Sequence, residues 1–593
     1  MPTEANSEPE SDSPSGVTDS STAERGTTVD DATPTDDARV DETPKQSAGG
    51  DDNTAGRRKP AVHRAVFWPA AIIILAFVAF AIIAPDVAES LFAGIQENIV
   101  GAFGWYYVLL VAFFVIFALY LGLSHYGGIK LGKDDDEPEF SLASWFSMLF
   151  AAGMGIGLVF YGVAEPLAHY AEPRPGVTGD DVELAQSALS QTYLHWGVSA
   201  WAIYVVVGVA IAYAVHRKGR PVSIRWALEP LMGDKVRGRA GDVIDVVAVV
   251  GTLFGVATSL GLGVLQISAG LGTTGIAEPT VFVQILLIAG ITVLTIFSLV
   301  TGVKKGMKWL SNTNLILAGL VLVFVLVSGP TLFLLRDFVQ SIGTYLQNFV
   351  GLSFTVSAFS GEAGEAWQGL WTTFYWGWWM SWAPFVGIFI ARISKGRTVR
   401  QFVAGVILVP TIVTFLWFAV LGGTALHTEV FGDGGLIGEG GAVDYDASLF
   451  LLLDTLPGGS IVTVGAIVLI GVFFVTSSDS GSLVLGMLST GGQEEPRNWV
   501  RIFWAVVTAL VAIALLLSGG LDALKTAAII TALPFSVVMI AMCAATAKAF
   551  GREHRATERA RRAAFRDSIG EHYGLDESPP RAPRRWRFPK ARR

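Results

Sequence analysis

The segment from Trp371 to Phe385 reads WTTFYWGWWMSWAPF and holds five tryptophans within twelve residues. In its central cluster, Trp378 and Trp382 share one face of a helix, and Trp379 stands beside them. The negative face of an indole attracts a cation, by about 2 kcal/mol when the cation is desolvated. An aromatic belt at a membrane interface is the alternative, but a belt explains one or two such residues per helix end. The density therefore favours a site for a quaternary ammonium group, which has no N–H to donate.

Composition narrows the class of protein. The chain has 593 residues, 52% hydrophobic and 16% charged, with a mean hydropathy of +0.51. We therefore expect an all-α polytopic membrane protein. The single cysteine, Cys543, excludes an intramolecular disulfide. The eight histidines lack metal-ligand spacing and no Walker-type loop occurs, which argues against a zinc enzyme and an ATP-driven pump. We expect no enzymatic activity, no cofactor and no nucleic-acid partner.

The two tails carry opposite charge. Residues 1–56 contain 14 acidic and 3 basic residues, which predicts a disordered acidic tail over residues 1–60. Residues 552–593 contain 13 basic and 6 acidic residues, within a basic tail over residues 550–593. Arg555, Arg559 and Arg562 lie on one face of a helix expected from 552 to 566, which suits contact with anionic membrane lipids.

Apolar segments of membrane length predict twelve transmembrane helices. They are expected near 65–84, 101–124, 141–163, 190–215, 243–268, 280–301, 311–331, 368–392, 402–424, 459–484, 500–518 and 526–549. Basic residues gather in the loops after even-numbered helices, which places both termini in the cytoplasm.

Helices three and eight each begin a run of five spans, as in a five-plus-five inverted repeat. The expected units are two peripheral helices (61–140), a first repeat (141–331), an amphipathic surface helix (332–366) and a second repeat (367–549).

Three further segments carry candidate site residues. Helix three reads AAGMGIG over residues 151–157, and this glycine density predicts either unwinding that exposes carbonyls to a cation, or close helix packing. Helix four places Trp196, Trp201 and Tyr204 on one broad face. We interpret His195 as a satisfied bundle histidine rather than a proton relay, because no carboxylate neighbours it in sequence.

Helix ten ends in a run of hydroxyls over FFVTSSDS (473–480). Thr476 and Ser477 offer uncharged hard oxygens, which suit a sodium ion. Bonds back to carbonyls of the same helix are the commoner explanation for a single hydroxyl. Asp479 is expected near the cytoplasmic end, where an arginine of a loop can pair with it.

Four segments together resemble the betaine/carnitine/choline transporter family, and most of all its sodium-coupled glycine betaine carriers. They are GMGIGLVFYGVAEP (153–166), HWGVSAWAIY (195–204), FYWGWWMSWAPFVGIFIARISKGR (374–397) and FFVTSSDSGS (473–482). The resemblance spans residues 65–550. It implies twelve helices with the leucine-transporter-like inverted repeat, a homotrimer in a bacterial cell membrane, and osmoprotectant uptake.

The resemblance also implies roles for single residues. The trimethylammonium box is expected from Trp196, Trp201, Tyr204 and Trp379, with Trp378 and Trp382 in the outer approach and Met154 and Ser259 near the substrate. One sodium site is expected from Ala151, Met154, Phe473, Thr476 and Ser477. A second would use Thr252 and Phe385, but Val256 stands where the family has a threonine, so this site lacks one oxygen ligand.

The expected function is sodium-coupled import of glycine betaine or a related quaternary-ammonium osmoprotectant, regulated through the C-terminal tail. Ectoine, proline, choline and carnitine are alternative substrates. A passive osmolyte channel and an amino-acid symporter are alternatives of other classes. A channel would lack closed aromatic and hydroxyl sites, and an amino-acid symporter would need carbonyls facing an ammonium group rather than four rings.

Overall fold

The computed structural model describes residues 62–153, 155–301 and 304–573. Within these ranges the chain is helical, and the one β-type contact is an isolated bridge between Lys130 and Thr398. The expected acidic tail, Met154 and residues 574–593 lie outside the described residues.

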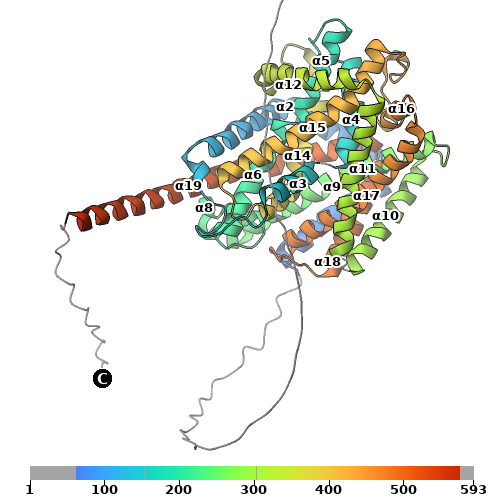
Figure 1. The fold of residues 1–593 in the computed structure, drawn as a ribbon. Helices are drawn as coiled ribbons and strands as arrows, with labels where there is room; N and C mark the ends of the chain where they lie inside the picture. Colours follow the sequence, from blue (N-terminus) through green and yellow to red (C-terminus); the bar gives the residue numbers. More distant parts are fainter. Residues whose placement is uncertain (1–61, 154, 302–303, 574–593) are drawn as a thin grey trace, which may run out of the picture. The chain divides into compact units, whose positions relative to one another are not determined.

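The long helices, shown in Figure 1, are α1 (Arg64–Ile83), α2 (Pro85–Leu123), α3 (Leu142–Gly153), α4 (Ile156–Ala171), α5 (Asp181–Trp196), α6 (Val198–Ala212), α9 (Arg239–Thr273), α10 (Val281–Thr301), α11 (Lys304–Ser328), α12 (Thr331–Ser353), α14 (Phe374–Ile393), α15 (Val399–Phe431), α17 (Gly459–Ser489), α18 (Asn498–Leu517) and α19 (Gly520–His572). Shorter elements are η1 (His125–Gly128), η2 (Tyr213–Arg217), α7 (Ile224–Ala227), α8 (Glu229–Met232), η3 (Gly233–Arg237), α13 (Gly361–Gln368), η4 (Gly369–Thr373), η5 (Glu439–Gly441) and α16 (Ser448–Asp454).

The described residues contain ten helices long and apolar enough to cross a membrane, or eleven if the bent pair α3 and α4 is one span. Helix α14 lies outside this count although it has 20 residues. Its tryptophans, tyrosine, glycine and arginine lower its hydropathy without shortening it. With α14, each of the twelve segments predicted from sequence is helical.

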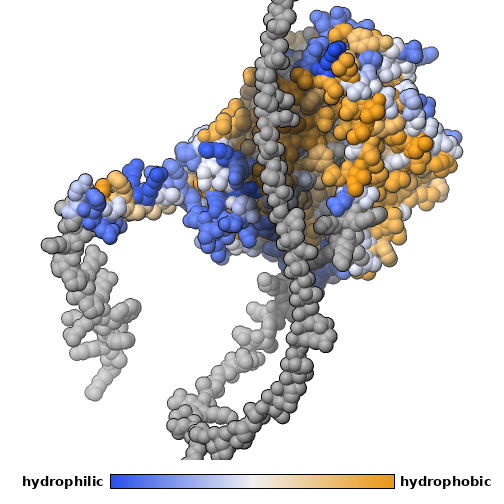
Figure 2. Space-filling view, viewed as in Figure 1, coloured by the Kyte–Doolittle hydropathy of each residue, from blue (hydrophilic) through white to orange (hydrophobic). Residues whose placement is uncertain are grey.

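The outer surface matches a membrane protein. Hydrophobic residues cover the visible faces of α10 and α11, whereas hydrophilic residues gather on the far end of α19 (Figure 2). On α10, Phe282, Val293 and Phe297 expose more than half of their surface. Exposure of such an apolar face to water is unfavourable, whereas the hydrocarbon core of a bilayer can cover it.

Several predicted helix ends were wrong. Helix α2 begins at Pro85 rather than near 101, and α19 runs on to His572 rather than ending near 549. Hydropathy identifies only the apolar part of a helix, and both extensions are polar. The residues beyond 549 are mainly arginine, alanine and glutamate, which favour helix, so the expected basic helix continues α19 without a break.

Helices α6 and α14 cross at a pair of glycines, Gly208 and Gly387. Helix α14 packs against α6, α9 and α19. At the crossing with α6, a Cβ added to Gly387 would lie 2.6 Å from Val207 Cγ1 and 3.2 Å from the backbone nitrogen of Gly208. Real Cβ atoms do not approach a carbon so closely, so glycine sets the spacing of the two helices.

Replacing Gly387 with alanine should force α6 and α14 apart and destabilise the fold by about 1–3 kcal/mol, as overpacking does in other cores. The midpoint of thermal unfolding of the purified protein in detergent measures this. Gly319→Ala on α11 is the control, because nothing lies within 4 Å of its added Cβ. Equal midpoints for the two variants would contradict the account of the crossing.

Candidate functional site

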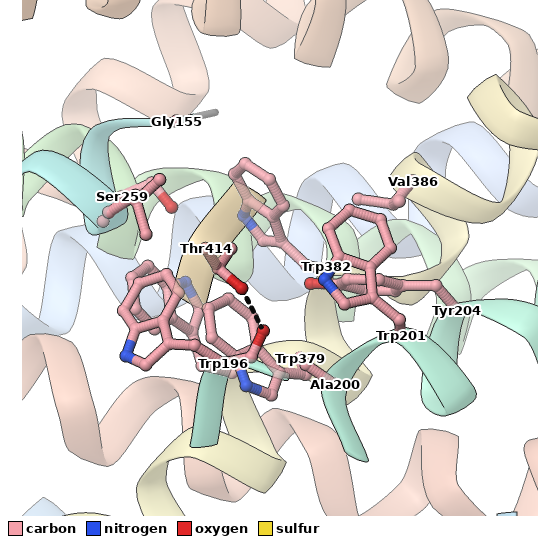
Figure 3. A pocket seen from close by; sticks show the side chains of 13 residues that line it. Gly155, Trp196, Ala200, Trp201, Tyr204, Ser259, Trp379, Trp382, Val386 and Thr414 are labelled. Carbon is pink, nitrogen blue, oxygen red and sulfur yellow. Dashed lines mark hydrogen bonds between the residues drawn. The ribbon is translucent and has the colours of Figure 1, made fainter. Parts of the chain in front are cut away.

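One cavity collects the aromatic residues of α5, α6 and α14. Its empty volume is about 490 Å³, including space open to solvent. The cavity is lined by Gly155, Gly157, Leu158, Trp196, Ala200, Trp201, Tyr204, Ser259, Trp378, Trp379, Trp382, Val386 and Thr414. Figure 3 shows Trp196, Trp379 and Trp382 around a common space, with Gly155 and Ser259 at the opposite end from Tyr204.

The rings meet edge to face and therefore leave π surfaces open. The centroid of Trp379 lies 4.9 Å from that of Trp196 at an interplanar angle of 71°, and 6.3 Å from that of Tyr204 at 72°. Trp201 and Tyr204 are 5.3 Å apart at 71°. Trp378 instead stacks on Trp379, with centroids 4.7 Å apart at 14°, and so backs this wall.

A break in the predicted fourth span separates two of the rings. Helix α5 ends at Trp196 and α6 begins at Val198, so the expected continuous helix is wrong at Gly197. A Cβ added to Gly197 would lie 2.6 Å from the carbonyl oxygen of Tyr193 and 2.7 Å from the ring of Phe415. The break lets the chain turn tightly against α15, while Trp196 lines the same cavity as Trp201 and Tyr204 of α6.

A second break forms the wall opposite α14. The axes of α3 and α4 differ by 64°, and α4 begins at Ile156 after the extended residue Gly155. The glycine run therefore interrupts the helix. A Cβ added to Gly157 would lie 2.4 Å from Trp378 Cη2 and 3.1 Å from Trp196 Cη2. Glycine here lets both indoles approach the start of α4, where backbone N–H groups have no helical partner.

The chemistry of the cavity is that of aromatic faces. Among the described lining residues no side chain is charged. The hydroxyls of Ser259 and Thr414 donate to the carbonyls of Gly255 and Trp196, both at 3.3 Å. Such a lining offers few acceptors to an N–H cation and much π surface to a cation without N–H groups.

The structure brings seven of the eight predicted substrate residues to this one cavity. They are Trp196, Trp201, Tyr204, Ser259, Trp378, Trp379 and Trp382. The eighth, Met154, lies outside the described residues. Their contact with a substrate stays a prediction.

The first predicted sodium site falls on α17 and the end of α3. Phe473 is buried, whereas Thr476 and Ser477 are partly exposed and Ala151 is exposed. Thr476 Oγ1 lies 3.0 Å from the carbonyl oxygen of Val472 and 3.1 Å from that of Phe473. The simpler explanation, a hydroxyl bonded to its own helix, therefore describes the geometry of Thr476 in the structure.

Sequence reasoning missed a side chain beside Thr476. Asn314 of α11 is buried, and its Nδ2 donates to Thr476 Oγ1 at 3.0 Å. Among the described residues nothing bonds its Oδ1. The only signal in the sequence is a polar amide in an apolar span, which does not specify a partner.

The second predicted sodium site is on α9 and α14. Thr252 is fully buried, and within the described part of the chain its hydroxyl has no hydrogen-bond partner. Val256, one turn later, is buried too, and Phe385 is partly buried beside Trp382. The hydroxyl of Thr252 is thus a buried oxygen without a partner, while Val256 contributes no oxygen.

Asp479 is buried and accepts from Arg501 Nη2 at 3.0 Å. The expectation of an arginine partner is met, but its expected place in a loop is wrong. Arg501 lies on α18.

A buried polar cluster behind the pocket was not predicted. Glu165 and His169 of α4 and His195 of α5 place their ligand-type atoms within 4.8 Å of one another. The expectation that no such cluster exists is wrong, because a spacing search along one segment cannot detect residues from two helices. His195 does have a carboxylate neighbour, since its Nδ1 lies 2.7 Å from Glu165 Oε1. The signal for this cluster that the sequence offered was Glu165, an ionisable residue inside a membrane span.

Comparison with known proteins agrees with the geometry. Residues 65–555 match the betaine/carnitine/choline family transporter pattern. An uncharacterized transporter of Mycobacterium bovis is 50% identical over 516 residues, which is 86% of each chain. The glycine betaine transporter OpuD of Bacillus subtilis is 46% identical over 84% of this chain and 96% of its own. Glycine betaine transporter 1 of Vibrio parahaemolyticus is 43% identical over 81% and 92%. The chain therefore belongs to the betaine/carnitine/choline transporter family.

Proposed function

We propose that the protein is a sodium-coupled symporter that imports glycine betaine. The observation that carries this proposal is the cavity walled by Trp196, Trp201, Tyr204 and Trp379, whose described lining includes no charged side chain. A trimethylammonium group has no hydrogen-bond donors, so aromatic faces replace its hydration better than carbonyls or carboxylates do. Two relatives, the glycine betaine transporters of Bacillus subtilis and Vibrio parahaemolyticus, support the same substrate.

The carboxylate of the substrate needs donors at the other end of the cavity. Gly155 and Gly157 lie there, at the start of the 16-residue helix α4. The first N–H groups of a helix and its dipole both favour an anion. A zwitterion can therefore bind with its cation among the rings and its anion at this helix end, without a charged residue in the wall.

Accumulation of such a zwitterion needs a coupled ion. Glycine betaine has no net charge, so the membrane potential cannot drive its uptake. One sodium ion contributes about 2.3 kcal/mol per 100 mV, or roughly 40-fold accumulation.

We place that sodium at Thr476 and Ser477, with backbone oxygens of Phe473 and of residues near Ala151. Uncharged oxygens of this kind suit a hard monovalent cation. The unpartnered Oδ1 of Asn314 is a further oxygen next to Thr476. We place a second ion near Thr252 and Phe385, and we expect weaker binding there because Val256 lacks a hydroxyl.

The same proposal includes a homotrimer in the cell membrane with both termini in the cytoplasm. Helix α12 supports contact with another copy or with lipid, because it keeps apolar side chains exposed. Val339 is 71% exposed and Leu346 is 63% exposed.

We also propose that the C-terminal part of α19 regulates transport in response to osmotic stress through contacts with anionic lipids. Ion pairs that join this part of α19 to the end of η2 support this role. Glu553 accepts from Arg217 at 2.6 Å and from Lys218 at 2.8 Å. Arg217 ends η2, which directly follows α6, the helix of Trp201 and Tyr204. Interactions between such charges decay over about 8 Å at physiological ionic strength, so internal salt can shift them.

Trp379→Leu and Trp201→Leu should each weaken binding of glycine betaine by about 2 kcal/mol, roughly 30-fold in Kd, because each removes one ring from the cation. Quenching of tryptophan fluorescence in the purified variants measures the Kd. Trp68→Leu is the matched control, because Trp68 is 54% exposed on α1, far along the chain from the cavity residues. Two cavity variants with the affinity of the control would refute the ring assignment.

Replacing both Thr476 and Ser477 with alanine should abolish sodium-dependent uptake of labelled glycine betaine into proteoliposomes, since it removes two oxygens from a site of about five. Uptake is measured across a sodium titration, with potassium as the replacement ion. Thr463→Ala on the same helix is the control. A double variant that keeps the wild-type half-saturation by sodium would rule out this site, and sodium-independent uptake by the wild type would rule out the coupling.

Deleting residues 552–593 should leave sodium-coupled uptake intact but make its rate nearly independent of external osmolality, because the contacts of Glu553 are lost. Reconstituted vesicles exposed to hyperosmotic shifts provide the measurement. Deletion of residues 574–593 alone, which keeps all of α19, is the control. Several-fold activation of the longer deletion would show that the tail is not the sensor.

A further inference from the structure

A fully buried carboxylate, Glu165, lies directly behind the aromatic wall. Its Oε2 accepts from Trp196 Nε1 at 2.6 Å and from the hydroxyl of Tyr375. Its Oε1 lies 2.7 Å from His195 Nδ1 and 3.3 Å from His169 Nε2. Side chains of four residues therefore converge on two carboxylate oxygens.

These contacts select the ionised carboxylate. An indole N–H can only donate, and with the tyrosine hydroxyl it fills Oε2 as an acceptor. On the other side, His195 Nε2 faces Thr372 Oγ1 and Gln191 Nε2, each at 3.1 Å. Both are able to donate to it, and these contacts match a neutral His195 with its proton on Nδ1, pointing at Glu165.

The free-energy cost of burying an ionised carboxylate inside a membrane must be offset by hydrogen bonds or by a nearby cation. Trp196, Tyr375 and His195 supply hydrogen bonds. A buried ammonium also lies near the cluster, because Lys525 Nζ is 5.5 Å from the centroid of Trp371, and the ring of His169 is 4.4 Å from the same centroid. Trp371 thus contacts both the cation and a member of the cluster.

The cluster anchors two of the pocket indoles. Trp196 is bonded to Glu165 itself, and Trp379 Nε1 donates to the backbone oxygen of His195 at 2.8 Å. By contrast, Trp378 Nε1 and Trp382 Nε1 have no partner within the described residues. The two anchored rings are also the edge-to-face pair with centroids 4.9 Å apart.

We propose that Glu165 is a positioning residue for the substrate: its carboxylate, which also accepts from Tyr375 behind the wall, fixes Trp196 in the orientation that receives the quaternary ammonium group. Donation to an anion also polarises the indole, which makes the ring face more negative and a better host for a cation. Glu165 does not line the cavity, so it acts through the rings. This inference rests on the proposed function.

The test replaces Glu165 with glutamine, which keeps the shape but removes the charge and one acceptor oxygen. The expected result is a roughly ten-fold higher Kd for glycine betaine, by fluorescence quenching. In protein labelled with 5-fluorotryptophan, the ¹⁹F resonance of Trp196, assigned from its absence in Trp196→Phe, should shift as its hydrogen bond weakens. Glu429→Gln is the matched control, since that carboxylate binds the backbone N–H groups of Leu436 and Ile437.

A double-mutant cycle separates positioning from plain charge. If Glu165 acts through Trp196, Glu165→Gln should cause little further loss of affinity in the Trp196→Phe background. An equal ten-fold loss there would overturn the proposal, as would an unchanged Trp196 resonance in Glu165→Gln.

Two further measurements keep the inference testable. If Glu165→Gln does not fold, Glu165→Asp keeps the charge at shorter reach and should shift the same resonance, while an unshifted resonance would overturn the proposal. Failure of the wild type to bind glycine betaine would refute the proposed function alone, and the ¹⁹F resonance would still decide whether Glu165 holds Trp196.

Discussion

The proposed function places one constraint on the structure: a cation that cannot donate a hydrogen bond must lose its water to something other than hydrogen-bond acceptors. Aromatic faces meet this requirement, but only if several surround the cation at once. Trp201 and Tyr204 of α6 and Trp379 of α14 come from the two sides of one helix crossing, and Trp196 comes from the end of α5. The spacing of α6 and α14 at Gly208 and Gly387 therefore sets the geometry of the cavity.

The rings keep this geometry only if their orientations are fixed. Hydrogen bonds to groups outside the cavity fix two of them. Trp196 and Trp379 bond to Glu165 and to the backbone of His195, not to groups that face the substrate. The N–H groups of these two indoles are thus hydrogen-bonded behind the wall, and their π faces remain for the ligand. Gly157 and Gly197 let the backbone approach the rings of Trp378, Trp196 and Phe415 more closely than any side chain would allow.

Much of this could be predicted from the sequence, and the exceptions have physical causes. Apolar segments located the twelve predicted spans, and the tryptophan density identified Trp378, Trp379 and Trp382 among the residues that share the cavity. Hydropathy failed at the polar ends of α2 and α19, and helical periodicity did not reveal the break at Gly197. Glu165 and His195 are 30 residues apart in sequence, and Asn314 and Thr476 are 162 apart, so no local pattern could pair them.

The central claim is that the cavity recognises a quaternary ammonium group by its lack of N–H donors. The direct measurement is the Kd of the purified protein for glycine, N-methylglycine, N,N-dimethylglycine and glycine betaine under one set of conditions. These ligands share a carboxylate and differ only in how many N–H groups methyl groups replace. The account predicts that affinity rises with each methyl group and is highest for glycine betaine. Equal affinity across the series, or tightest binding of glycine, would contradict it.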